Sequence, residues 1–259
     1  MIGMLIDVTK CVGCEKCVAA CVKANGCDPA AADRDRATSP DGLSADRLTT
    51  VQPIGWDHFA KKACMHCLEP SCVSACLVGG ITRSENGAVV YDPDKCIGCR
   101  YCMLACPFHV PRYEWSAKVP FMKKCELCEE RLADGEIPAC ADACPQNAIE
   151  FGERDELLRL AHQRIGENPD GYIDHVWGEH EFGGTSVLYI SDADLAELGW
   201  PSPDTESIPH LVEPVMHATP IVGGSVLASV AGVNWIVRRR MQQMHGPDAS
   251  SNGHGGGEQ

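Results

Sequence analysis

The sequence predicts an α+β fold in which short strands and helices surround cysteine-rich loops, followed by one long apolar helix near the C-terminus. Three observations predict it. Of the 259 residues, 17 are cysteine, and most of them stand in C-x-x-C runs. Short runs with strand or helix character lie between these cysteines. Residues 215–237 contain no Asp, Glu, Lys or Arg.

The composition excludes some classes of protein. Asp and Glu number 36 against 22 Lys and Arg, a formal net charge of −14, which disfavours nucleic acid because its phosphates need cationic partners. The hydrophobic fraction of 44% allows a core, but aromatic residues supply only 6%. Disulfide scaffolds of this cysteine density are usually short secreted chains. In a chain of this length, C-x-x-C runs indicate metal binding.

Sixteen of the cysteines fall into four motifs, in order along the chain. The first and third have the spacing x2, x2, x3; the second has x2, x4, x3; the fourth has x2, x11, x3. The motifs are Cys11, Cys14, Cys17, Cys21; Cys64, Cys67, Cys72, Cys76; Cys96, Cys99, Cys102, Cys106; and Cys125, Cys128, Cys140, Cys144. Only Cys27 is left over, and we interpret it as a spare thiol.

The spacing of the first and third motifs is that of the bacterial ferredoxin run, in which three thiolates hold one iron–sulfur cluster and the fourth holds the neighbouring cluster. Pro107 and Pro145 follow the third and fourth motifs, as is typical of such runs. Zinc is the competing metal, since paired C-x-x-C motifs also build zinc sites. Zinc sites do not explain third and fourth cysteines at fixed steps, so we favour iron–sulfur clusters.

The cysteine motifs alternate with simple elements. Asn86-Gly87 predicts the turn of a hairpin. Asp-Pro and Ser-Pro-Asp-Gly predict that the polar insertion 27–46 is a loop. We expect strands at 4–8, 81–83, 88–91, 148–151 and 187–190, a helix at 155–165, and a linker at 199–209. Lysines and arginines beside the motifs either offset cluster charge or are ordinary surface residues; they are Lys10, Lys16, Lys95, Arg100, Lys123 and Lys124.

The apolar run near the C-terminus predicts a membrane-spanning helix. As a helix, residues 215–237 would span about 34 Å, enough for a hydrocarbon core. Three arginines, 238–240, follow at once, which predicts a cytoplasmic C-terminus and an outer-face location for everything before the helix. Small residues at Gly224, Ala228 and Gly232 suggest packing against a partner helix. The alternative is a buried helix of a soluble protein.

The two ends of the chain carry further expectations. Only ten residues precede Cys11, so we expect no secretory signal peptide in this chain. His217 lies near the outer end of the apolar run, where an interfacial hydrogen bond is the favoured role and contact with a partner's haem or quinone the alternative. Residues 246–259 are expected to be disordered.

The chain resembles the four-cluster iron–sulfur electron-transfer subunits of membrane-bound respiratory oxidoreductases, nearest to the hydrogenase-2 type electron-transfer subunit and the formate dehydrogenase-N beta subunit. The resemblance extends to about Arg240. It rests on GMLIDVTKCVGCEKCVAAC from Gly3, CMHCLEPSCVSAC from Cys64, GCRYCMLACPFHVPRYEW from Gly98, KCELCEER from Lys124 and GEHEFGGTSVLYI from Gly178.

The resemblance implies two ferredoxin-like two-cluster modules with loop insertions, plus one C-terminal transmembrane helix. The implied domains are 1–198 for the cluster region, 199–212 for a linker, 213–240 for the anchor and 241–259 for the tail. Leu77 departs from the family's usual proline after Cys76. Four [4Fe-4S] clusters are implied, bound by Cys11, Cys14, Cys17 and Cys144; Cys125, Cys128, Cys140 and Cys21; Cys64, Cys67, Cys72 and Cys106; and Cys96, Cys99, Cys102 and Cys76.

The implied function is a relay of electrons, without catalysis by this chain. Its implied partners are a catalytic subunit, hydrogenase-like or molybdopterin-containing, and an integral membrane subunit that bears quinone or haem. The implied location is the outer face of the cytoplasmic membrane, reached by export with a partner that carries a twin-arginine signal. Alternatives are the same relay on the cytoplasmic face, a zinc-stapled interaction module, and a soluble enzyme subunit with an irregular C-terminal helix.

Several residues beside the motifs have two possible roles. His58, His66 and His109 are candidate haem ligands. His66 and His109 lie in or beside cysteine loops, so we expect them to tune the reduction potential of a cluster or to pack against the loops. Tyr113 and Trp115 are expected in a core or an interface rather than as redox groups.

Overall fold

The computed structural model describes residues 1–55, 57–115, 117–198, 200 and 206–244. The chain divides into two compact units, Met1–His210 and Leu211–Gln259. The first unit contains all the cysteines and is mixed α and β, so the predicted fold class is confirmed. The second unit contains most of one long apolar helix.

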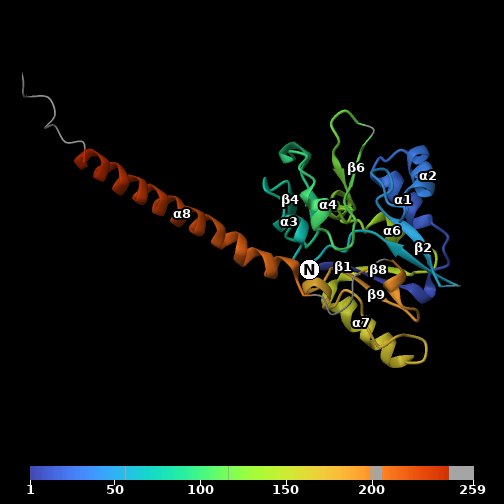
Figure 1. The fold of residues 1–259 in the computed structure, drawn as a ribbon. Coiled ribbons are helices and arrows are strands. Elements are labelled where there is room, and N and C mark those ends of the chain that lie inside the picture. The colour runs from blue at the N-terminus through green and yellow to red at the C-terminus, as the bar shows by residue number, and fades with distance from the viewer. Residues whose placement is uncertain (56, 116, 199, 201–205, 245–259) are drawn as a thin grey trace, which may run out of the picture. The chain divides into compact units, whose positions relative to one another are not determined.

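A three-stranded sheet supports the first unit. Strand β1 (Ile2–Asp7) is central; β8 (Ile149–Glu153) pairs with it antiparallel and β9 (Val187–Ile190) parallel. Helix α7 (Arg154–Glu167) packs on one face, as Figure 1 shows below the sheet. Because side chains alternate along a strand, Leu5 packs against α7, while Met4 and Ile6 face the cysteine-bearing segments.

The cysteine-bearing segments contain only short elements. Their described residues form three antiparallel hairpins: β2 (Thr50–Ile54) with β3 (His58–Lys62), β4 (Ile81–Arg83) with β5 (Val89–Tyr91), and β6 (Arg112–Tyr113) with β7 (Met122–Lys123). The predicted hairpin around Asn86-Gly87 is therefore confirmed. The helices are α1 (Lys16–Ala24), α3 (Ser71–Ser74), α4 (Tyr101–Ala105), α5 (Glu129–Ala133) and α6 (Ala139–Asp142).

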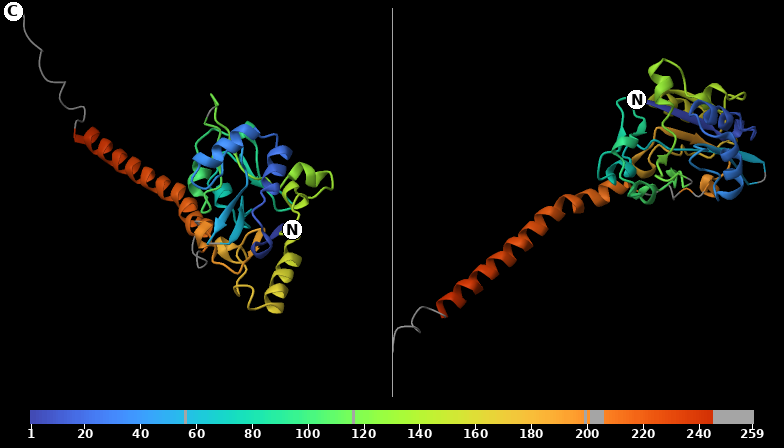
Figure 2. Two further views of the ribbon diagram at one scale, coloured as in Figure 1. Left: turned by 90° about the vertical axis from the view of Figure 1, so that its right-hand side faces the viewer. Right: turned by 90° about the horizontal axis from the view of Figure 1, so that it is seen from above.

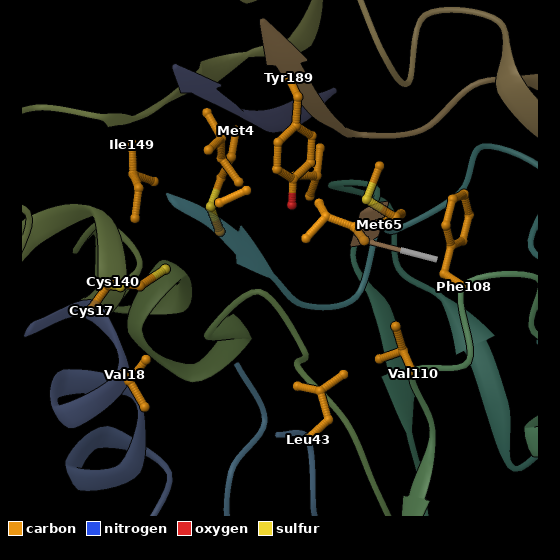
Figure 3. Packing of buried hydrophobic residues seen from close by; sticks show 14 of the residues in the cluster. Met4, Cys17, Val18, Leu43, Met65, Phe108, Val110, Cys140, Ile149 and Tyr189 are labelled. Atoms are coloured by element: carbon orange, nitrogen blue, oxygen red, sulfur yellow. The ribbon is translucent and has the colours of Figure 1, made fainter. Parts of the chain in front are cut away.

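Cysteine side chains form part of the main core. Cys17 of α1 and Cys140 of α6 are 8% and 5% exposed and pack with Met4, Val18 and Ile149. Figure 3 shows the two thiols between the helices and the sheet, with Tyr189 farther along the same core. Thiols occupy volume that aromatic side chains fill in most cores, which fits the low aromatic content.

The insertion 27–46 was predicted to be a loop, and this prediction is wrong for its first half. Helix α2 (Pro29–Thr38) lies beside α1, both blue in Figures 1 and 2. Asp28 caps it by accepting a hydrogen bond from the Ala30 N–H, and Pro29 stands at the first helical position. Asp-Pro, read as a turn signal, is here a helix start.

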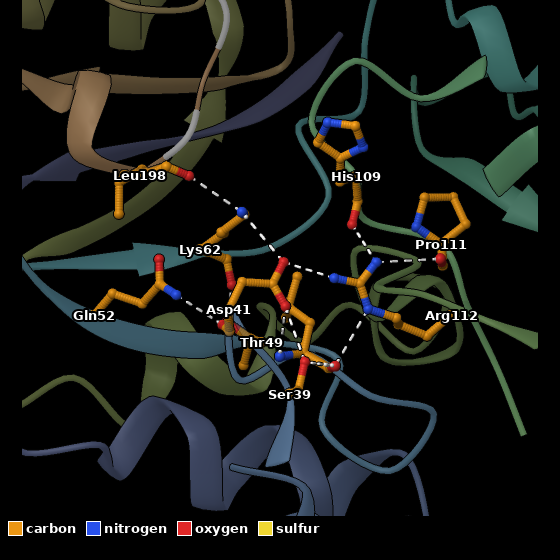
Figure 4. Close-up of polar contacts among 10 residues, drawn as sticks. Ser39, Asp41, Thr49, Gln52, Lys62, His109, Pro111, Arg112 and Leu198 are labelled. Atoms are coloured by element: carbon orange, nitrogen blue, oxygen red, sulfur yellow. Dashed lines mark hydrogen bonds and ion pairs between the residues drawn. The ribbon is translucent and has the colours of Figure 1, made fainter. Parts of the chain in front are cut away.

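The second half of the insertion is a turn that ties distant segments together. Its Asp41 accepts a 2.6 Å bond from Arg112 and pairs with Lys62 at 3.3 Å. Gln52 donates to the Asp41 carbonyl at 2.8 Å. These contacts are drawn in Figure 4. Although burial opposes it, Arg112 and then Lys62 hold the pKa of the Asp41 carboxyl below its usual value.

Helix α8 (Ile208–Met244) is longer than the predicted anchor at both ends. It begins within the predicted linker, whose residues 199 and 201–205 lie outside the described residues, and it includes the first four residues of the predicted tail. The tail beyond 244 also lies outside the described residues. Residues His217–Met244 are apolar and long enough to cross a membrane, with mean hydropathy 1.6.

Candidate iron–sulfur sites

The first and third cysteine motifs fold into the same loop. Gly13 and Gly98, between the first two cysteines of each motif, have φ values of 68° and 70°. Glu15 and Arg100, directly after the second cysteine, are also left-handed and begin α1 and α4. A Cβ on Gly13 would lie 2.8 Å from the Phe59 ring, so this glycine is required by conformation and by space.

The second and fourth motifs repeat a different loop. Between their first two cysteines stand His66 (φ 46°) and Leu127 (φ 59°). Pro70 and Pro138 then precede α3 and α6, helices of four residues each. The chain therefore contains the same pair of cysteine loops twice, as expected for two related modules.

The structure brings together two sets of four thiols from the first and fourth motifs. One cavity is lined by Cys11, Cys14, Cys17 and Cys144, which we call site one. A second cavity is lined by Cys21, Cys125, Cys128 and Cys140, which we call site two. In each site the fourth cysteine comes from the other motif. These are the two sets implied for the first two clusters.

The second and third motifs supply the other eight thiols. The thiols of Cys64, Cys72 and Cys106 lie within electrostatic reach of Cys67, and burial, followed by these thiols, raises the pKa of Cys67. We call this set site three. Cys102 lies close to Cys96 and Cys99, and it shares a hydrophobic cluster with Cys76. We call this set site four.

Backbone N–H groups point at several of these sulfurs. Gly80 donates to Cys76 at 3.2 Å, Ala148 to Cys144 at 3.3 Å and Gly98 to Cys96 at 3.4 Å. Such bonds favour the thiolate, which is the form that binds metal. The Gly80 bond closes the loop after Cys76, where Leu77 replaces the usual proline.

Burial by itself opposes the thiolate. It raises the pKa of Cys17 to about 11, that of Cys64 to about 11 and that of Cys72 to about 12. Thiols with raised pKa values become stable thiolates when a positive metal group is bound between them. The donor set therefore fits a metal cluster.

Two buried polar atoms also fit a sulfur-rich group. The Nδ1 atom of His66 accepts the Val89 N–H at 2.9 Å, so Nε2 carries the proton. That Nε2 and the Tyr91 hydroxyl are buried with no hydrogen-bond partner among the described residues. Burial, followed by the neighbouring Cys96 thiol, raises the pKa of Tyr91. Cluster sulfur atoms would accept hydrogen bonds from such donors.

A single zinc ion requires its thiol ligands close together. Ligands 2.3 Å from one tetrahedral ion lie about 3.8 Å apart. Within the described ranges, no three His, Cys, Asp or Glu side chains converge closely enough to hold a single metal ion.

The remaining candidates lie apart from the four sites or beside them. Cys27 is half-buried, and burial, followed by Asp46, raises the pKa of its thiol. His58 pairs with Asp192 at 3.4 Å. The side chain of His109 is exposed.

Tyr113 has a more specific place. It is buried, and its hydroxyl lies 3.8 Å from the Cys102 sulfur, whereas Trp115 is 58% exposed.

One residue of the sites was not predicted from the sequence: Lys61, a buried residue that lines site two. The only sequence feature that could have pointed to Lys61 is the Lys-Lys pair at 61–62, which lies in a strand that the sequence did not predict.

Comparisons with known proteins agree with this geometry. Residues 55–154 match the family described as a 4Fe-4S dicluster domain. A protein of Nitratidesulfovibrio vulgaris is 41% identical over 248 residues, covering 92% of this chain and 67% of the relative. The hydrogenase-2 operon protein HybA of Escherichia coli O157:H7 is 33% identical over 284 residues, covering 94% and 86%. The iron–sulfur subunit of the nitrate-inducible formate dehydrogenase of Escherichia coli K12 is 34% identical over 209 residues, covering 76% and 70%.

Proposed function

The chain belongs to the family of ferredoxin-type 4Fe-4S dicluster subunits that includes HybA and the formate dehydrogenase iron–sulfur subunits, and on this premise we propose that it relays electrons through four [4Fe-4S] clusters. The relay connects a catalytic subunit, of hydrogenase or formate dehydrogenase type, with a membrane subunit that bears quinone or haem. When bound, the clusters supply one-electron transfer. The protein holds them with sixteen thiolates and shields them from water.

The observation that carries this proposal is the order of the four sites. Cys17 of site one lies within electrostatic reach of Cys140 of site two. Cys64 of site three lies near Cys125 of site two, and Cys72 near Cys102 of site four. The sites therefore form a row, one to four, in which each has its neighbour close by.

The most exposed motif cysteines lie at the two ends of this row. Of the sixteen motif cysteines, the exposed ones are Cys14 of site one and Cys99 of site four. Electrons can therefore enter and leave at the two ends, while the cysteines of sites two and three are buried or partly exposed. This is the arrangement needed between two partner subunits.

We assign site four to the membrane partner. Within the first unit, His210 near the start of α8 lies 3.0 Å from Glu69, which belongs to the loop of the second motif. His210, the last residue of the first unit, thus lies beside the module of sites three and four. Apolar side chains around site four are exposed, as expected of a docking surface; they are Leu77, Ile97, Tyr101, Leu104, Trp115, Val119 and Phe121.

The composition and contacts of α8 support a membrane anchor. Hydroxyl groups within it bond to carbonyls one turn back, as Thr219 does to Val215 at 2.7 Å and Ser225 to Ile221 at 2.8 Å, so they are satisfied without water. Arg239 lies over the Trp235 ring at 5.3 Å, a pairing typical of the interface. We propose that this end is cytoplasmic and the cluster unit faces outward.

Removal of the anchor tests the proposed location. The full chain is expected to require detergent for extraction, and a chain that ends at His210 to be released in aqueous buffer with the same iron content. A tagged full chain should co-purify with a catalytic and a membrane subunit. Release of the full chain by a salt wash, or a reporter after Arg240 found outside the cytoplasm, would contradict the membrane assignment or the orientation, respectively.

The tyrosines of site four provide a test of cluster binding there. The Tyr91→Phe and Tyr113→Phe variants each remove a hydroxyl beside a site-four sulfur. A hydrogen bond of this kind stabilises the more negative, reduced state by about 1 kcal/mol, so one reduction potential should fall by about 40 mV. Potentiometric titration followed by electron paramagnetic resonance measures this. Tyr172→Phe is the control, because the Tyr172 hydroxyl donates to Asp7 at 3.0 Å rather than to a sulfur, and it should leave all potentials unchanged.

A further inference from the structure

Two lysines of the first unit are buried among thiols. Lys61 and Lys124 are each 3% exposed, and neither forms an ion pair with a carboxylate within the described ranges. Transfer of an ammonium group from water to a protein interior is strongly unfavourable unless negative charge lies nearby. The negative charge that these lysines meet must therefore come from another source.

Lys61 lies at site two. It lines the same cavity as Cys21, Cys125, Cys128 and Cys140. It also acts electrostatically on Cys17 of site one. Its place is fixed by strand β3, where it pairs with Val51 and its carbonyl accepts the Tyr189 hydroxyl at 2.9 Å.

The next residue along β3 provides a natural contrast. Lys62 is equally buried, at 4% exposed, but successive side chains of a strand point to opposite faces. Its ammonium group pairs with Asp41 at 3.3 Å and donates to the Leu198 carbonyl at 3.2 Å (Figure 4). The charge of Lys62 is thus balanced within the protein, away from the thiols.

Lys124 lies beside the loop of site three, because it bonds to Val89, whose N–H donates to His66 between Cys64 and Cys67. Its ammonium group donates to the Val89 and Cys125 carbonyls. It acts electrostatically on three thiols of site three, namely Cys64, Cys72 and Cys106. Glu126 is within electrostatic reach but forms no ion pair with it. The preceding residue, Lys123, is exposed and again provides a contrast.

We propose that Lys61 and Lys124 are charge-compensating residues that raise the reduction potentials of the clusters in sites two and three. This inference rests on the proposed function. A cluster with four thiolates carries about −2 when oxidised and gains one further negative charge on reduction. One electron enters, and no proton or covalent bond is exchanged. A fixed positive charge therefore favours the reduced form more than the oxidised form.

Each lysine lies next to one module in the sequence and next to the other module in space. Lys61 precedes the second motif, yet it serves the site formed by the first and fourth motifs. Lys124 precedes the fourth motif, yet it serves the site formed by the second and third motifs. Each module thus depends on the other for its buried cation, at the point where sites two and three adjoin.

The test compares four variants of the full chain, purified without oxygen in detergent. Lys61→Met and Lys124→Met remove the charge, and Lys62→Met and Lys123→Met are their matched controls. Each charge removal should lower the equilibrium constant for reduction of one cluster at least tenfold, which is about 59 mV for one electron. The controls should change no potential. Lys61→Arg and Lys124→Arg keep the positive charge, so each should show the reduction potential of the unsubstituted protein.

The outcomes separate this inference from the proposed function. A wild-type protein without iron–sulfur clusters defeats the proposed function. Wild-type clusters with unchanged potentials in Lys61→Met and Lys124→Met overturn the inference alone. If Lys61→Met instead loses its cluster while Lys61→Arg and Lys62→Met keep theirs, the charge is needed to hold that cluster, and the potential measured in Lys124→Met decides the inference. Equal cluster loss in Lys61→Met and Lys62→Met overturns it.

Discussion

Removal of the iron is expected to unfold the first unit rather than leave a folded apoprotein. Helices α3 and α6 contain four residues each, too few to be stable on their own. Cys17 and Cys140 occupy the main core, so loss of their metal would leave polar thiols and empty space there. Metal binding and folding are coupled in such sites. Far-ultraviolet circular dichroism should lose the contribution of the first unit when iron is removed.

The control is a sample that passes through the same procedure under conditions that protect its clusters from oxidation. Its circular dichroism spectrum should not change. Helix α8 lies in the other unit and should retain its helical signal in detergent. A fully native spectrum of iron-free protein, with protected amide groups in β1 and β8, would contradict the expectation.

Replacement of a single cysteine in the middle of the row is expected to have the largest effect on electron transfer. Cys125→Ser removes a buried thiolate from site two, next to Cys64 of site three. Because sites two and three are the only described connection between the two open ends, reduction of site four from the site-one end should nearly cease. Iron should fall by up to about a quarter.

Cys27→Ser is the matched control, because Cys27 belongs to none of the four sites. It should keep both the iron content and the transfer rate of the unsubstituted protein. Rapid-mixing spectroscopy of the complex, with the donor of the catalytic subunit, measures transfer through the row. Unimpaired transfer through Cys125→Ser would show that electrons do not follow the row.

The sequence predicted those parts of the fold that depend on local chemistry. Asn86-Gly87 marked a hairpin because few other residues adopt its turn, and the pattern of Leu157, Ala161 and Ile165 marked α7. The region 27–46 was misjudged because Asp-Pro begins helices as well as turns. Strands β2 and β3 were not predicted, since Pro53 and a charged Lys-Lys pair are unusual in strands.

The candidate sites divide in the same way. The C-x-x-C loops are local, so their metal-binding character is visible in the spacing. Which fourth cysteine completes each set depends on how the modules interleave, and that came from family resemblance rather than from spacing. Lys61 could not be found, because only the register of β3 decides that Lys61 faces the thiols while Lys62 faces Asp41.

The number and type of clusters test the central claim most directly. Iron and acid-labile sulfide should be measured in anaerobically purified full-length protein, together with Mössbauer spectra in the oxidised and reduced states. The proposed relay predicts about sixteen iron atoms per chain, all in [4Fe-4S] clusters, each reducible by one electron. About eight iron atoms, or zinc in place of iron, would contradict it.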